Sequence, residues 1–251
     1  MRAALRRTIA VTGGVLASGL AGLAAATPAQ AVSIELPDLT GGSGPTSSIV
    51  LLLALTVLAV APALLLMTTS FTKIIVVLSI TRNALGLQGV PPNQVLAGLA
   101  IFLSFFVMAP VLGIINSDAL QPYLDGSLTF GQAFDIARVP LEKFMLLNTR
   151  PEDLALMVKI SDEPAPPTPA DVSLTTLIPA FILSELRAAF IIGFVIFLPF
   201  LIIDMVVSSG LMSVGMIMLP PVLVSLPFKL LLFVLVDGWA LIISSLVNSY
   251  G

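Results

Sequence analysis

Residues 213–232 read SVGMIMLPPVLVSLPFKLLL, and the segment GMIMLPP at 215–221 interrupts one of the most apolar parts of the chain. Two consecutive prolines lack the backbone N–H groups that a continuous helix needs. The midpoint between Asp204 and Lys229, the nearest charges on either side, falls inside this segment. If the segment is the tip of a helical hairpin, both charges lie about 12 residues, or roughly 19 Å, from the tip. The spacing therefore predicts a hairpin whose arms carry opposite charges at equal depth.

The composition is that of an integral membrane protein. Of the 251 residues, 57% are hydrophobic and 10% are charged, whereas a soluble domain carries about a quarter charged residues. The sequence contains neither cysteine nor histidine, which excludes thiol nucleophiles, disulfides and histidine-based metal sites. Long apolar runs interrupted by proline predict an all-α membrane protein built from kinked helical hairpins.

The first 31 residues have the order of a secretory signal peptide. Three arginines in MRAALRR precede a small-residue apolar stretch, and Ala29-Gln30-Ala31 suits a cleavage site. We expect a cleaved signal peptide at 1–31, which leaves the new N-terminus outside the cytoplasm; an uncleaved first helix is the alternative. Residues 32–48 are rich in glycine, serine and proline and are expected to form a flexible periplasmic lead-in.

Three regions are expected after the lead-in. They are an N-terminal helical hairpin region at 49–115, an acidic periplasmic insert with a proline-rich linker at 116–173, and a C-terminal hairpin at 174–251. The 68–93 connection carries two bases and no acid, whereas the insert carries nine acids and four bases. Because cytoplasmic connections are enriched in Lys and Arg, we expect 68–93 in the cytoplasm and the insert in the periplasm. The pattern predicts four apolar segments.

Charged residues interrupt the apolar sequence of the C-terminal region: Glu185, Arg187, Asp204, Lys229 and Asp237. Charges within a membrane are costly, so they usually face a bundle interior, a water path or a partner. The principal interpretation is a buried ion-pair network in which Asp204 binds Lys229, with Glu185 or Asp237 as competing partners of Lys229. Two alternatives remain: separate snorkelling of Asp204 and Lys229 to an interface, and a proton relay through the three carboxylates.

The predicted tip combines methionines with prolines. The expected helix breaks are Pro199, Pro220, Pro221 and Pro227. Met212, Met216 and Met218 cluster at the tip, and their thioethers suit Cu(I), but copper sites usually add Cys or His. Ordinary core packing is a second interpretation. A third is that adaptable methionine side chains from several subunits close a pore.

The sequence resembles the FliP family of flagellar biosynthetic proteins in two stretches. They are MTTSFTKIIVVLSITRNALGLQGVPPNQVLAGLAIFLSFFVMAPV at 67–111 and SELRAAFIIGFVIFLPFLIIDMVVSSGLMSVGMIMLPPVLVSLPFKLLLFVLVDGW at 184–239. The resemblance implies a homo-oligomeric subunit, in a five-membered ring, of a type III protein export gate. With FliQ-like and FliR-like subunits the ring would form a closed, cone-shaped complex. FlhA-like and FlhB-like export components and unfolded flagellar protein cargo are the further implied partners.

The resemblance also implies a location and a set of site residues. The gate belongs to the flagellar basal body in the bacterial inner membrane, displaced toward the periplasm. Its constriction corresponds to Met216, Ile217 and Met218, with Met212 as an additional candidate. Relatives commonly have methionine at the middle position, and the β-branched Ile217 is stiffer. The family's buried charged positions correspond to Glu185, Asp204 and Lys229.

No enzyme activity, cofactor, metal or nucleic-acid partner is expected from this sequence. The principal rival is a multipass ion or solute transporter with a buried Asp/Lys site. Transporters often contain internal repeats with discontinuous helices, and this sequence has no convincing repeat. A stable monomer that binds a small solute would favour the transporter, whereas a homo-oligomer with copurifying FliQ-like and FliR-like chains would favour the gate.

Overall fold

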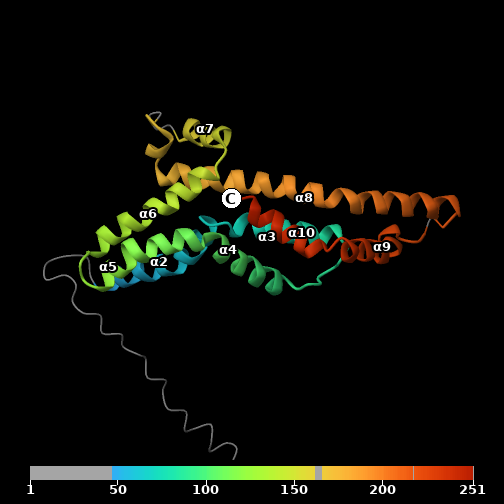
Figure 1. Cartoon of the computed structure of the whole chain (residues 1–251), viewed down its shortest axis with the longest axis horizontal. Coiled ribbons are helices and arrows are strands. Elements are labelled where there is room, and N and C mark those ends of the chain that lie inside the picture. The colour runs from blue at the N-terminus through green and yellow to red at the C-terminus, as the bar shows by residue number, and fades with distance from the viewer. Residues whose placement is uncertain (1–46, 162–165, 217, 251) are drawn as a thin grey trace, which may run out of the picture. The chain divides into compact units, whose positions relative to one another are not determined.

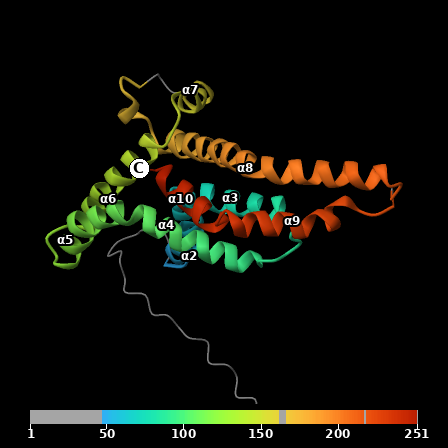
Figure 2. The ribbon, with the colours of Figure 1, turned by 45° about the vertical axis from the view of Figure 1, so that its right-hand side comes forward.

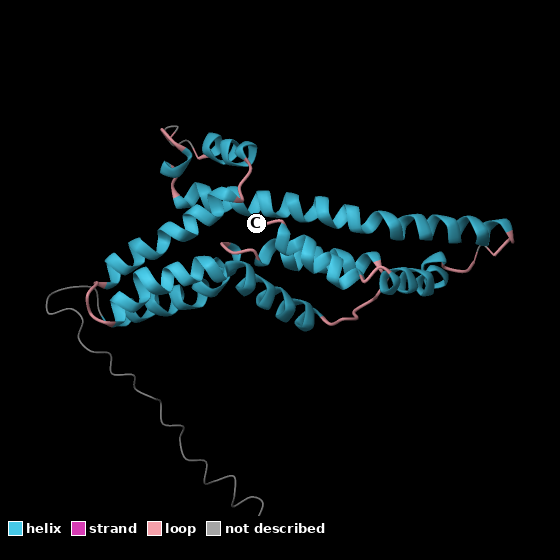
Figure 3. Cartoon of the chain, in the orientation of Figure 1, coloured by secondary structure: helices cyan, strands magenta, loops and turns pink. Residues whose placement is uncertain are grey.

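A computed structural model describes residues 47–161, 166–216 and 218–250, and all regular secondary structure in these ranges is helical (Figure 3). The expected signal peptide, most of the expected lead-in and Ile217 lie outside the described residues. The α-helices are α2 (Ser47–Met67), α3 (Phe71–Ala84), α4 (Asn93–Ile115), α5 (Gln121–Leu124), α6 (Phe130–Leu147), α7 (Pro151–Ile160), α8 (Leu174–Ser213), α9 (Pro221–Leu235) and α10 (Gly238–Asn248). A π-helical turn, η1 (Asn116–Leu120), joins α4 to α5, and a 3₁₀ turn, η2 (Pro169–Asp171), precedes α8.

The chain divides into two compact units, residues 1–55 and residues 56–251. The described part of the first unit is the beginning of α2. The second unit contains all the other helices and every candidate site residue described below.

Two helices are long and apolar enough to cross a membrane. One is the continuous α4–η1–α5 helix, Asn93–Leu124, and the other is α8. Two bent pairs, α2 with α3 and α9 with α10, pass the same test together, with bends of 67° and 62°. By length and composition, the described residues therefore contain two helices suited to span a membrane, or the expected four if each bent pair is one span.

Helices α8 and α9 form the predicted C-terminal hairpin (Figures 1 and 2). Helix α8 has 40 residues, which corresponds to a length of roughly 60 Å. The chain leaves α8 through Gly215, whose φ of +78° lies in the left-handed region that glycine adopts without strain. Pro220 directly precedes α9 and Pro221 is its first residue, a position where the missing N–H costs no helical hydrogen bond.

The prediction of helix breaks at Pro199 and Pro227 is wrong. Helix α8 continues through Pro199, and α9 continues through Pro227. A single proline removes one backbone hydrogen bond, and apolar helices tolerate this loss when neighbouring groups and small backbone adjustments compensate. The paired prolines at 220 and 221 follow a turn and begin a new helix, so their effect on the chain is different.

Helix α3 packs along α8 and forms the largest helix–helix contact of the second unit. Gly193 of α8 lies against Ile80 of α3: a Cβ atom at this glycine would lie 2.6 Å from Ile80 Cδ1. Small residues allow such close helix approach in membranes. Around this contact a hydrophobic core gathers fully buried side chains of α3, among them Ile74, Val77 and Leu78.

The insert has a separate core against the beginning of α8. Phe144 and Met145 of α6 pack with Met108 of α4 and with Leu177 and Phe181 of α8. Helix α6 begins with a capping box, in which the Thr129 side chain and the Gln132 backbone and side chain bond reciprocally. The insert is therefore packed on the same long helix that carries the hairpin tip.

Candidate functional site

The structure brings Asp204 of α8 and Lys229 of α9 together across the hairpin. Lys229 Nζ lies 2.6 Å from Asp204 Oδ2, and the Lys229 side chain is almost completely buried. The other carboxylate oxygen, Oδ1, accepts a hydrogen bond of 2.5 Å from the hydroxyl of Ser225, which lies one helical turn before Lys229. Both carboxylate oxygens are thus bound from α9, an arrangement that holds the two arms in register.

Lys229 also joins the hairpin to α3. Its ammonium group donates a hydrogen bond of 3.1 Å to the carbonyl oxygen of Ala84, the last residue of α3. The C-terminal end of a helix carries partial negative charge and unpaired carbonyl groups, so a cation is favourable there. One lysine therefore connects three helices: α9 through its backbone, α8 through Asp204 and α3 through Ala84.

Glu185 binds a cation that was not a predicted site residue. Lys73 of α3 places Nζ 3.2 Å from Glu185 Oε1, and the Tyr250 hydroxyl donates a short hydrogen bond to Oε2. The Lys73 ammonium also lies 3.6 Å from the centroid of the Tyr250 ring, a cation–π contact. Burial raises the pKa of the Tyr250 phenol, so this hydroxyl keeps its proton as the donor. Glu185 is therefore a partner of Lys73 rather than of Lys229.

Lys73 contributes to the positive charge of 68–93, but neither Lys73 nor Tyr250 is among the predicted site residues. A signal for Lys73 was present, because it lies in an apolar run that contains no acid and so needs a carboxylate from elsewhere. No comparable signal identifies Tyr250, whose contact with Glu185 and with the Ser70 carbonyl depends on where α10 ends.

Arg187 binds the insert and does not join the Glu185 or Asp204 ion pairs. Its Nη2 lies 3.3 Å from Oδ1 of Asp153 on α7, a carboxylate that is 1% exposed. The Ser184 hydroxyl donates to the other oxygen of Asp153 at 2.8 Å and accepts from the Arg150 backbone N–H at 3.0 Å. These contacts attach α7 to the side of α8.

Asp237 is not part of these clusters. It lies between α9 and α10 at a φ of +50° and is exposed. Among the described residues it has no ion-pair partner, so its inclusion in the predicted buried network is not supported by the geometry of the single chain.

The tip exposes its methionines. The side chains of Met212 and Met216 are exposed, and Met218 is 99% exposed. The described residues contain no group of His, Cys, Asp and Glu side chains that could hold a metal ion. Exposed, unbranched thioether side chains at the end of the α8–α9 hairpin can pack against neighbouring molecules of irregular shape.

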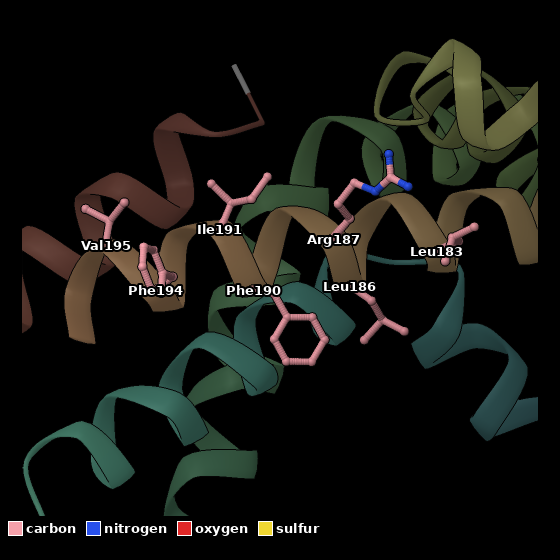
Figure 4. Close-up of a pocket in the computed structure, with 7 residues that line it drawn as sticks. All are labelled: Leu183, Leu186, Arg187, Phe190, Ile191, Phe194 and Val195. Atoms are coloured by element: carbon pink, nitrogen blue, oxygen red, sulfur yellow. The ribbon is translucent and has the colours of Figure 1, made fainter. Parts of the chain in front are cut away.

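A shallow, open apolar surface, which we call the α8 groove, runs along one side of α8 (Figure 4). It has a volume of about 540 Å³ and is lined by Arg187 and six apolar residues between positions 183 and 195 of the same helix. In Figure 4 the side chains of Arg187, Ile191 and Val195 extend from the same side of the helix. The groove joins a partly exposed cation to an apolar surface.

Comparison with known proteins gives consistent matches. The model of the FliP family matches residues 54–246. The flagellar biosynthetic protein FliP of Bacillus subtilis (strain 168) is 54% identical over 219 residues, which cover 86% of this chain and 99% of that protein. The FliP proteins of Cereibacter sphaeroides and Pectobacterium carotovorum are 50% and 49% identical, over 97% and 94% of this chain and 81% and 92% of their own lengths.

Proposed function

Because this chain belongs to the FliP family of flagellar biosynthetic proteins and is therefore a type III export component, we propose that it is a pore-forming subunit of the flagellar protein export gate. In this role it conducts unfolded flagellar subunits across the inner membrane. In this role the chain forms a passage for cargo and catalyses no reaction.

The observation that carries this proposal is the hairpin tip. Met216 and Met218 are exposed beyond the end of α8, while Asp204 and Lys229 hold the arms below them in register. Met212, Met216 and Met218 are all exposed at the tip of the single chain, and a group of exposed apolar side chains marks an interaction surface. Several tips that meet at one axis would cover each other and close the passage.

The proposed assembly is a five-membered homo-oligomeric ring that combines with FliQ-like and FliR-like subunits and contacts FlhA-like and FlhB-like components. The assembled gate lies in the basal body, displaced from the inner membrane toward the periplasm. The extensive exposed apolar surface of α4, α8 and α9 supports association with other subunits, because such a surface needs lipid or other helices as neighbours.

Gating is expected because the tip carries flexible methionine side chains, whereas an ion pair joins the two arms behind it. Unbranched methionine side chains change rotamer at little cost. They can therefore close the passage when it is empty and pack around an extended cargo chain when it is occupied. The ion pair and the Ser225 hydrogen bond hold the arms while the tips move. Cargo that enters from the cytoplasm would displace the tips, and their return would close the passage again.

The test is ion conductance of the purified gate in a lipid bilayer. Met216→Ala with Met218→Ala removes side-chain volume from the closed passage and should raise the resting conductance. Met205→Ala is the matched control, because Met205 is an exposed methionine of α8 away from the tip. Unchanged conductance of an intact double variant would argue against closure by the tip methionines.

Purification separates the gate from the rival transporter. The gate requires that the full chain copurifies as a homo-oligomer with FliQ-like and FliR-like chains. A stable monomer that binds a small solute through Asp204 and Lys229 would contradict the proposal.

A further inference from the structure

Asp237 is the one charge of the C-terminal region that lacks an ion-pair partner among the described residues. The residues from 174 onward contain five charges. Glu185 binds Lys73, Asp204 binds Lys229, and Arg187 binds Asp153. The carboxylate that remains also makes no capping hydrogen bond to α10, although it occupies the N-cap position.

The surroundings of Asp237 are apolar and uncovered. Val234, Leu235 and Val236 before it are exposed, as is Trp239 after it. An ionised carboxylate amid such side chains is unfavourable in lipid. These five residues, which we call the α9–α10 corner, therefore form an apolar surface with one negative charge, and a complementary surface would be apolar with one positive charge.

The α8 groove has this complementary character. Its only charged lining residue is Arg187, whose side chain is 48% exposed. A guanidinium group has five N–H donors, and Nη2 of Arg187 lies 3.3 Å from Asp153 Oδ1. Figure 4 shows the Arg187 side chain on the same side of α8 as Ile191 and Val195, so its guanidinium group lies at the edge of an apolar surface.

We propose that the α9–α10 corner of one copy of this chain occupies the α8 groove of the next copy, with Asp237 bound to Arg187 across the interface. An anionic lipid headgroup would match Arg187 but would leave Asp237 without a counter-charge. In a contact with a second copy of the chain, Arg187 gains a carboxylate and Asp237 gains a counter-charge. The two faces are different, so the contact is heterologous and repeats from copy to copy around a ring or along a helix. This inference rests on the homo-oligomer of the proposed function.

The pairing has a geometric consequence. Arg187 lies 17 residues before Asp204, and Asp237 lies 8 residues after Lys229, so the two partners differ in depth by nine residues, or roughly 13 Å along the hairpin. Neighbouring hairpins must therefore be displaced along their length by about this amount. Tilted hairpins that close into a ring have such a displacement.

Cysteine cross-linking of the purified full-length oligomer tests the contact. The chain contains no cysteine, so Ile191→Cys with Leu235→Cys introduces the only thiols, one in the groove and one in the corner, and leaves both charges in place. A short bis-maleimide should produce a ladder of dimers and larger species. Phe130→Cys with Leu235→Cys is the control: Phe130 is at least as exposed as Ile191 but lies outside the groove, and no ladder is expected.

Charge-neutral variants in the cross-linking background test the ion pair. Asp237→Asn is compatible with the left-handed backbone, and Arg187→Gln keeps a donor for Asp153. Each should reduce the ladder about tenfold, and the double variant should reduce it no further, because the partners act as a unit. Asp135→Asn, at an exposed carboxylate of α6, should leave the ladder unchanged.

The outcomes separate this inference from the proposed function. An intact homo-oligomer without the 191–235 ladder, a cross-link to a copurifying chain instead, or additive losses in the double variant would overturn the inference alone. If the chain forms no homo-oligomer, both the inference and the proposed gate are wrong.

Discussion

Lys73 of α3 and Glu185 of α8 form an ion pair that is almost completely removed from solvent. Their charged atoms lie 3.2 Å apart, and their side chains are 4% and 1% exposed. Each charge depends on the other, because an isolated buried charge is very unfavourable. The pair lies at the opposite end of α3 from the Lys229–Ala84 hydrogen bond, so both ends of α3 are attached to the hairpin.

Lys73→Met should destabilise the purified protein strongly, by about 3–5 kcal/mol, because it leaves Glu185 buried without a counter-charge. Thermal unfolding in detergent measures the effect. The double variant Lys73→Met with Glu185→Leu should recover much of the loss, since it removes both charges. If the double variant is less stable than Lys73→Met, the destabilisation arises from lost packing instead.

Lys229→Glu should impair gate assembly and motility, because it places two carboxylates against each other at Asp204. Adding Asp204→Lys restores opposite charges and should recover export in part. Recovery stays incomplete because a glutamate at 229 cannot donate to the Ala84 carbonyl, as Lys229 does. Swimming in soft agar and the amount of purified oligomer are the two measurements. Normal export by each single variant would contradict a role for the pair.

Gly193→Ala should weaken the contact between α3 and α8 by about 1–3 kcal/mol, because the added Cβ overlaps Ile80. Combining it with Ile80→Ala should restore part of the stability by vacating the space. Gly98→Ala is the control, since a Cβ there meets nothing within 4 Å. Thermal unfolding distinguishes the two glycines, and equal effects at both would show that helix propensity dominates.

Asp153→Ala should loosen α7 from α8, because Ser184 and Arg187 lose their common acceptor. We expect a loss of about 1–3 kcal/mol, the usual cost of unsatisfied buried polar groups. Hydrogen exchange should show faster exchange in α7 than in α8. Glu152→Ala, which removes the neighbouring exposed acid of the same helix, should leave the exchange rates unchanged.

Much of this architecture could be predicted from local sequence. The apolar runs predict the helices, and the equal distances of Asp204 and Lys229 from GMIMLPP predict that these charges meet across two antiparallel arms. That prediction needs only the rise per residue of a helix. The predictions for Pro199 and Pro227 were wrong because one missing hydrogen bond does not decide whether an apolar helix continues.

The sequence by itself determined the helical membrane character, the family and the position of the hairpin tip, since each depends on composition or on spacing along one segment. Only the tertiary structure decided that Glu185 binds Lys73 and Tyr250, that Arg187 binds Asp153, and that Asp237 is left without an ion-pair partner among the described residues. The choice among carboxylates and cations depends on which helices pack side by side. Contacts such as that of Gly193 with Ile80 set this packing, and the distances that result do not follow from separation along the chain.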